Sequence, residues 1–164
     1  YRRYLMPVKP FTLAFRFLHY GRYGKSADDE RLWPLYIGYE DLVRGYGYSS
    51  FDFNETFDGN RLFGSKLLIA NFELRFPLFR VLGLGSGFYG IWPIEFLGFY
   101  DVGVAWDDVN EASFLGGSRK PVSSAGIGLR TNLFNYLVLG LNYVYPFDRP
   151  QKGWHLQFTI TPGF

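Results

Sequence analysis

The chain has 164 residues, which suits one domain, and 48% of them are hydrophobic, which argues against disorder. Aromatic residues make up 21%, and the absence of cysteine excludes disulfide frameworks, thiolate metal sites and cysteine nucleophiles. The 17 basic and 15 acidic residues leave a net charge of +2, without the basic excess that a nucleic-acid binder needs.

The beginning of the chain carries no targeting signal. Residues 1–5 lack an apolar core followed by a small-residue cleavage site, and they show no clear helix or strand start. We interpret residue 1 as an internal cut or a processed start. No apolar run approaches the roughly 18 residues of a membrane helix.

Alternation of apolar and polar residues dominates the rest of the chain, and it predicts β-strands. Six segments alternate in this way, namely 9–22, 62–76, 94–107, 124–133, 137–145 and 154–164. Strands of soluble proteins usually have about 5–6 residues, whereas a tilted membrane strand needs about 9–11. The length of these segments therefore favours membrane-spanning strands.

The connections between these segments alternate in length as well. Residues 6–10 and 132–135 form short turns, whereas 23–61 and 107–121 form long loops. This pattern is typical of outer-membrane β-barrels with periplasmic turns and external loops. The Gly-rich connection 77–93 is the exception, because it is long and falls on the periplasmic side. Aromatic residues at strand ends, as in the girdles of such barrels, are Tyr20, Tyr23, Trp106, Tyr143, Tyr145 and Trp154.

We therefore predict an all-β protein, an antiparallel transmembrane β-barrel in the bacterial outer membrane, in contact with outer-membrane lipid. The alternative is a soluble ligand-binding β-barrel or sandwich, because its core also alternates. Strand length and an aromatic last residue, Phe164, favour the membrane barrel.

Several motifs resemble one family. The segment Val43-Arg44-Gly45-Tyr46 resembles the VRGF/VRGY loop motif of the bacterial surface antigen superfamily, which contains outer-membrane insertases and two-partner secretion transporters. An aromatic-Gly run at 36–39 precedes this motif, and three others follow it in the family's order, namely ELRFPL at 73–78, F-x-D-x-G at 99–103 with Trp106, and GxGLR at 126–130. The resemblance covers residues from about 10 to 164 and implies the C-terminal part of a sixteen-stranded barrel.

The last segment resembles the sorting signal of bacterial outer-membrane barrels. Its residues on one face are Trp154, Leu156, Phe158, Ile160 and Phe164. The resemblance implies recognition by the outer-membrane assembly machinery.

Acidic residues and one arginine are the candidate functional site. Alternation places Glu73 and Asp101 opposite the apolar faces of their strands, so they point into the barrel lumen, and Arg44 lies in a loop long enough to reach it. A guanidinium in a confined interior needs carboxylate partners. The resemblance implies a pair between Arg44 and Asp101, and more weakly between Arg44 and Glu73.

The neighbours of Arg44 have expected roles in the same loop. Gly45 and Gly47 allow the chain to turn sharply. Tyr46 is expected to pack against the barrel wall near Phe99. Together these residues predict a loop that folds into the lumen and braces it.

Closure is an open question at this stage. Six strands do not close a membrane barrel, whose smallest size is about eight. Three solutions exist. In the first, earlier strands complete a larger barrel. In the second, residues 1–5 and part of 32–40 supply two more strands, and in the third, copies of the chain associate edge to edge. The family resemblance favours the first solution.

No motif points to an enzyme, a metal or another cofactor, and we expect none. We treat residues 1–164 as one outer-membrane β-barrel domain with an external loop at 23–61. The resemblance implies assistance to polypeptides that enter or cross the outer membrane, with unfolded outer-membrane or secreted polypeptides as clients. The alternative is a membrane anchor or structural module of a larger protein whose active domain lies upstream.

Overall fold

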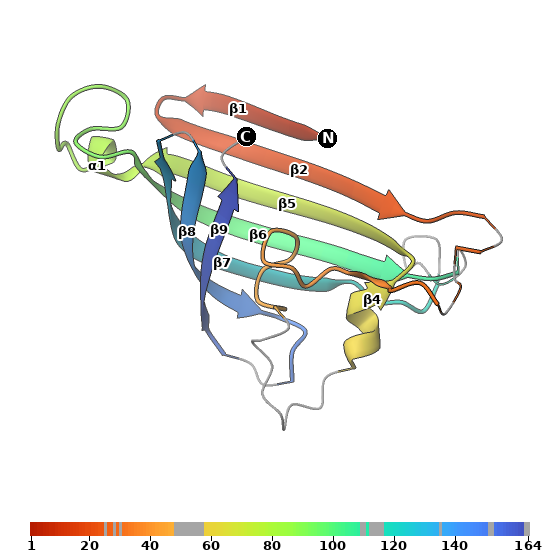
Figure 1. Ribbon diagram of the computed structural model, residues 1–164. Helices are drawn as coiled ribbons and strands as arrows, with labels where there is room; N and C mark the ends of the chain where they lie inside the picture. Colours follow the sequence, from red (N-terminus) through yellow and green to blue (C-terminus); the bar gives the residue numbers. More distant parts are fainter. Residues whose placement is uncertain are drawn as a thin grey trace.

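The computed structural model describes residues 1–24, 26–27, 29, 31–47, 58–108, 111, 117–134, 136–150 and 153–162. Its main feature is one antiparallel sheet whose strands are hydrogen-bonded to one another in the order in which they occur along the chain, apart from two short strands, which form a separate sheet (Figure 1). In sheet order these strands are β1 (Arg2–Val8), β2 (Phe11–Gly21), β5 (Lys66–Pro77), β6 (Ile94–Trp106), β7 (Val122–Leu133), β8 (Leu137–Pro146) and β9 (His155–Pro162). The predicted all-β, antiparallel fold is confirmed.

Strand β1 is an addition to the six strands expected from alternation. It pairs with β2 from Arg2 opposite Arg16 to Val8 opposite Phe11, with an irregularity between Leu5 and Val8. Residues 6–8, expected to be part of a turn, belong to this strand, so the turn shrinks to 9–10. Two charged residues and a proline in the strand mask its pattern, and edge strands tolerate such residues because only one side is paired.

The segment 32–40 does not supply a barrel strand. Only β3 (Leu35–Tyr36) is extended there, and it pairs with β4 (Phe63–Gly64) in a separate two-stranded sheet. A short 3-10 helix, η2 (Gly59–Leu62), precedes β4. Closure by two extra strands is therefore wrong, because the second segment turns into the interior instead of joining the sheet.

The register places the acidic candidates side by side. β5 and β6 pair continuously from Lys66 opposite Trp106 to Pro77 opposite Glu95, and Asn71 faces Asp101 across this pair. Since side chains alternate along a strand, odd-numbered residues of β5 and β6 share the inner face. Even-numbered residues such as Leu74 and Tyr100 lie on the outer face, where both are more than 40% exposed.

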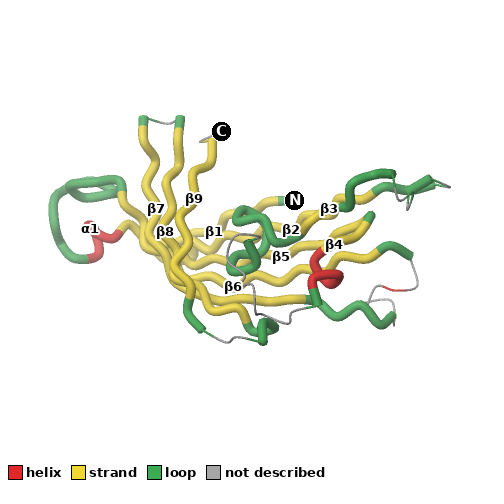
Figure 2. Tube along the Cα trace, turned by 60° about the horizontal axis from the view of Figure 1, so that its bottom comes forward, coloured by secondary structure: helices red, strands yellow, loops and turns green. Residues whose placement is uncertain are grey.

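The sheet curls around an interior. Strand β7 first follows β6 and then bends, so that its later part, with much of β8 and β9, runs at a steep angle to β2 and β5 (Figures 1 and 2). A cavity of about 590 Å³ is lined by residues from all seven strands, together with Glu40, Asp41 and Arg44 of the long loop. The strand order leaves β1 and β9 as edges, and no pairing joins them in the described part of the chain. The sheet is thus curled but open.

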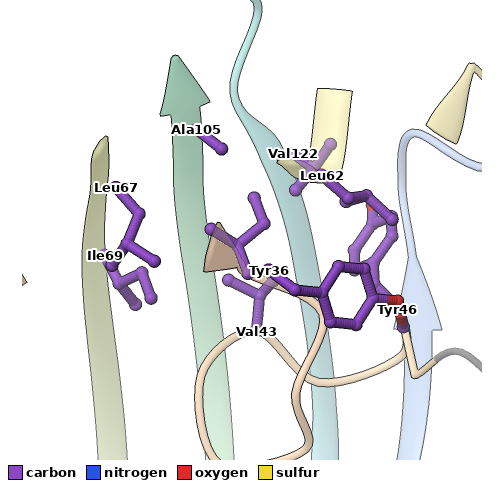
Figure 3. Close-up of a cluster of buried hydrophobic side chains, with 9 residues drawn as sticks. Tyr36, Val43, Tyr46, Leu62, Leu67, Ile69, Ala105 and Val122 are labelled. Carbon is purple, nitrogen blue, oxygen red and sulfur yellow. Dashed lines mark hydrogen bonds between the residues drawn. The ribbon is translucent and has the colours of Figure 1, made fainter. Parts of the chain in front are cut away.

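The loop between β2 and β5 fills part of this interior with apolar side chains. Tyr36, Val43 and Tyr46 pack with side chains of β5, β6 and β7 (Figure 3). The full cluster comprises Tyr36, Ile37, Val43, Tyr46, Leu62, Leu67, Ile69, Ala105 and Val122. Burial of each large aliphatic side chain stabilises the docked loop by roughly 1.5–3 kcal/mol.

The outer face supports a membrane barrel over a soluble one. The apolar residues of the alternating pattern lie on this face, while the inner face carries Asp101, Asn71 and the docked loop. Phe158 is 55% exposed, and Phe15 is only partly buried. A soluble barrel would seal these side chains in its core, so the structure does not fit that alternative.

The connection between β5 and β6 contains α1 (Leu78–Val81) and continues to residue 93. It lies at the opposite end of β5 from the long loop (Figure 1). Among the described residues, no helix is long and apolar enough to cross a membrane.

Candidate functional site

The guanidinium of Arg44 lies against the carboxylate of Asp101. Arg44 Nε is 2.6 Å from Asp101 Oδ2, and Arg44 Nη2 is 2.8 Å from Asp101 Oδ1, which is a bidentate pair. The backbone N–H of Arg44 also donates to Asp101 Oδ2 at 3.3 Å. Asp101 is fully buried and Arg44 is 8% exposed. Such charge-assisted, geometrically matched bonds are among the strongest in proteins.

Glu73 supplies a second carboxylate to Arg44. Its Oε1 lies 2.8 Å from Arg44 Nη2, while its Oε2 accepts a hydrogen bond from Arg75 Nε at 2.7 Å. The ring of Phe99, opposite Glu73 in the register, lies 3.6 Å from Arg44 Cζ and offers the cation a π face. The structure therefore brings Arg44 together with Asp101 and Glu73, its expected partners, and also with Phe99, which was expected beside Tyr46 instead.

Two further polar residues complete the surroundings of this pair. Asn71 Nδ2 donates to Asp101 Oδ1 and to the carbonyl of Leu42, both at 2.7 Å. Arg16 Nε donates to Asn71 Oδ1 at 2.8 Å. Because every Asp101 oxygen accepts at least two bonds, the buried charge is well compensated, as burial of an ion requires.

The peptide groups of Gly45 form a second attachment point. The N–H of Gly45 donates to Gln157 Oε1 on β9 at 3.1 Å, and its carbonyl accepts from Arg149 Nη1 at 3.0 Å. Arg149 lies in the loop after β8 and is only 2% exposed. Gly45 adopts φ +85°, a left-handed conformation in which a side chain is strained, whereas Gly47 has no positive φ. The expected sharp turn therefore depends on Gly45.

Tyr46 packs against the barrel wall, but not near Phe99, where we expected it. Its ring belongs to the apolar cluster of the loop, and Phe99 packs instead with Leu97 and Val144. The hydroxyl of Tyr46 donates to the carbonyl of Ser123 on β7 at 2.7 Å, and this bond explains the position. Burial raises the pKa of the Tyr46 phenol, so the group stays a hydroxyl donor at neutral pH.

Gly103 makes room for the loop on β6. A Cβ atom at this position would lie 2.7 Å from Cγ2 of Val43. Val43 is fully buried, so any side chain at position 103 would push the loop away from the sheet. The glycine two residues after Asp101 thus allows the arginine beside Val43 to reach the carboxylate.

Sequence reasoning missed several contacts of the loop. Asn71 and Gln157 could have been found, because their alternation places them on the inner face. Arg149 and Asp148 carried no such signal. Arg149 contacts Gly45 across 104 positions of the chain, and the backbone N–H of Asp148 donates to the hydroxyl of Tyr46 at 3.2 Å.

The residues of the expected sorting signal lie at an edge of the sheet. Leu156, Phe158 and Ile160 of β9 are all more than half exposed, and Trp154, just before the strand, is 51% exposed. They share the outer face of the sheet. Phe164 lies outside the described residues, so its place is not described here.

The arrangement offers ion pairing and hydrogen bonding, all of it non-covalent. Among the described residues, no group of three or more histidine, cysteine or acidic side chains is arranged to hold a metal ion.

A comparison with family models identifies the fold family. The model of the Omp85 superfamily domain matches residues 33–164, which is most of the chain. This chain belongs to the Omp85 superfamily. A search of curated proteins finds no match.

Membership confirms the resemblance to outer-membrane insertases and transporters at the level of the superfamily. The Omp85 match includes the docked loop and the strands from β5 to β9, and it begins after β1 and β2. Omp85 proteins are associated with the outer membrane, which agrees with the apolar outer face of this sheet.

Proposed function

We propose that this Omp85 chain assists the insertion or translocation of polypeptides at the bacterial outer membrane. The observation that carries the proposal is the docking of loop residues 35–46 in the interior, where Arg44 makes a bidentate bond with buried Asp101. The described part of the loop occupies part of the interior, and every described contact that holds it is non-covalent. A lumen closed in this way can open for a client.

One edge of the sheet supports the second half of the proposal. Within the described sheet, strand β9 is hydrogen-bonded to one neighbour only, β8. An unpaired strand edge can add an extended peptide by β-augmentation. We propose that an unfolded outer-membrane or secreted polypeptide pairs in this manner and that no enzymatic step is involved.

The outward residues of β9 support an assembly partner. Leu156, Phe158 and Ile160 form an exposed alternating row at the edge of the sheet. We propose that the outer-membrane assembly machinery recognises this row and that outer-membrane lipid covers it after assembly.

A membrane anchor is the second candidate function. It is favoured by the long connection 78–93, which departs from the short periplasmic turns usual for such barrels. In this case the active part of the protein lies upstream, and the barrel serves to hold it at the membrane.

Client insertion into liposomes separates the two candidates. The full-length protein is reconstituted, and the folding rate of an unfolded outer-membrane client is compared with the rate in empty liposomes. We expect acceleration by the wild type and a loss of it in Arg44→Ala. The matched control is Arg31→Ala, because Arg31 lies in the same loop with a side chain that is 88% exposed. A barrel that neither accelerates insertion nor forms a pore contradicts the proposal and favours the anchor.

A further inference from the structure

The connection between β5 and β6 exposes an unusual number of apolar side chains. The exposed residues are Val81, Leu82, Leu84, Phe88, Ile91 and Trp92, each more than 40% exposed and Trp92 63% exposed. We call this set the 81–92 patch. Several large apolar side chains exposed in one short segment indicate a surface that binds another protein or a membrane.

The segment is folded, so the exposure does not come from an irregular chain. Leu82 N–H donates to the carbonyl of Leu78 at 3.1 Å, and Leu84 N–H donates to the carbonyl of Phe79 at 2.8 Å. Gly90 has φ +80°, and a Cβ atom there would lie 2.4 Å from the carbonyl oxygen of Leu84. The backbone thus packs against itself at the centre, while the large side chains point away from it.

The charge of the segment suits a lipid surface. Between residues 78 and 93 the sequence contains no acidic residue, and its single charged side chain is the exposed Arg80. Phospholipid headgroups carry phosphate, which a guanidinium binds well. Tryptophan is enriched at membrane interfaces, where its ring is partly apolar and partly hydrated.

The patch continues the lipid-facing surface of the sheet. On the outer face, the ring of Phe76 on β5 lies 5.1 Å from that of Phe96 on β6 and 5.5 Å from that of Phe11 on β2. These rings lie at the end of the sheet where the connection leaves β5 and returns to β6. Figures 1 and 2 both show the connection extending beyond this end. One apolar surface therefore runs from the strands into the connection.

We propose that the 81–92 patch inserts into the interfacial region of the periplasmic leaflet of the outer membrane. The occupant is phospholipid, with the apolar side chains among the upper acyl chains and Arg80 at the phosphate level. Interfacial segments of this type bury apolar area without crossing the bilayer. The connection then anchors the β5–β6 hairpin at a fixed depth. A covering protein domain is the competing occupant, and the experiment below separates the two.

Fluorescence quenching of Trp92 tests the proposal in the full-length protein. The protein is reconstituted in phosphatidylethanolamine–phosphatidylglycerol vesicles with or without brominated phospholipid, and the emission of Trp92→Phe is subtracted from that of the wild type. We expect the Trp92 component to be quenched by brominated lipid and protected from aqueous iodide. The control is Trp33→Phe, because Trp33 is 92% exposed in the loop at the other end of the sheet. Its component should show the reverse behaviour.

Leu82→Asp provides a second variant that places a negative charge in the patch. We expect a red shift of the Trp92 component and weaker bromine quenching, while heat-dependent electrophoretic mobility shows that the barrel is folded. Two results overturn the proposal. Iodide quenching of Trp92 places it in water, and protection of Trp92 from both quenchers shows that protein covers it.

Discussion

Asp101→Asn removes one charge from the docked loop with little change in shape. Asp101 Oδ2 accepts from the Nε and the backbone N–H of Arg44, and Oδ1 accepts from Arg44 Nη2 and Asn71 Nδ2. An asparagine must place its NH₂ group at one of these two positions. In either orientation, two donors then face a donor, so rotation of the amide cannot restore the network.

The expected cost follows from burial. Loss of one partner from a buried ion pair destabilises by about 3–5 kcal/mol, because the other charge is left uncompensated. Glu73 still faces Arg44 at 2.8 Å, so we expect the lower end of this range. About 3 kcal/mol corresponds to a factor on the order of one hundred in the equilibrium between docked and undocked loop.

Trypsin measures this equilibrium because it cleaves after arginine. Arg44 is 8% exposed, whereas the side chain of Arg31 in the same loop is 88% exposed and serves as the internal standard. In Asp101→Asn we expect a large rise in cleavage after Arg44 relative to cleavage after Arg31. Mass spectrometry of the released peptides gives both rates.

A second acid-to-amide change serves as the matched control. Asp107 also accepts from a backbone N–H, that of Ser65 at 2.7 Å, and pairs with Arg119 at 3.1 Å, but it does not touch Arg44 in the described contacts. Asp107→Asn should leave cleavage after Arg44 unchanged. The reasoning is refuted if Asp101→Asn folds and its Arg44 is cleaved no faster than in the wild type.

Three further changes are measured with the same cleavage ratio. Glu73→Gln should weaken docking of the loop by about 1–2 kcal/mol, which is less than the effect of Asp101→Asn, because the bidentate pair between Arg44 and Asp101 remains. Equal effects of the two substitutions would contradict this. Gly103→Ala should undock the loop by about 1–3 kcal/mol, since the new Cβ meets Val43 at 2.7 Å, and wild-type protection would count against the close packing. Tyr46→Phe should cost about 1 kcal/mol, because it removes the bond to the Ser123 carbonyl and the bond accepted from the Asp148 N–H. No change would show that these two bonds contribute nothing.

The sequence predicted the strands well because a membrane sheet imposes one simple rule. A strand with lipid on one face and lumen on the other must alternate, and β5 through β9 follow this pattern at nearly full length. β1 escaped the rule because Arg2, Arg3 and Pro7 occupy an edge strand in which neither face is buried. The segment at 35–36 does not alternate either, because it is extended but lies in the interior of the curled sheet and has no lipid-facing side.

The site was predictable in its charges and less so in its tertiary contacts. A buried guanidinium must find carboxylates, and alternation leaves few inward acids on neighbouring strands, so Asp101 and Glu73 could be chosen. The position of Tyr46 depends on the backbone carbonyl of Ser123 on β7. Every residue has such a carbonyl, so the sequence does not indicate which one accepts the bond. The same holds for Arg149, whose partner is the carbonyl of Gly45.

Three consecutive loop residues attach to different parts of the curled sheet. Arg44 binds Asp101 on β6 and Glu73 on β5, Gly45 binds Gln157 on β9, and Tyr46 binds β7. Because the N–H of Gly45 donates to Gln157 on edge strand β9, displacement of that strand and release of the loop must share part of their cost. The bidentate pair on β6 does not involve the edge. On the proposed function, a client that pairs with β9 disturbs the Gly45–Gln157 bond first while Arg44 still holds the loop, so we expect edge opening and full release to have separate energies.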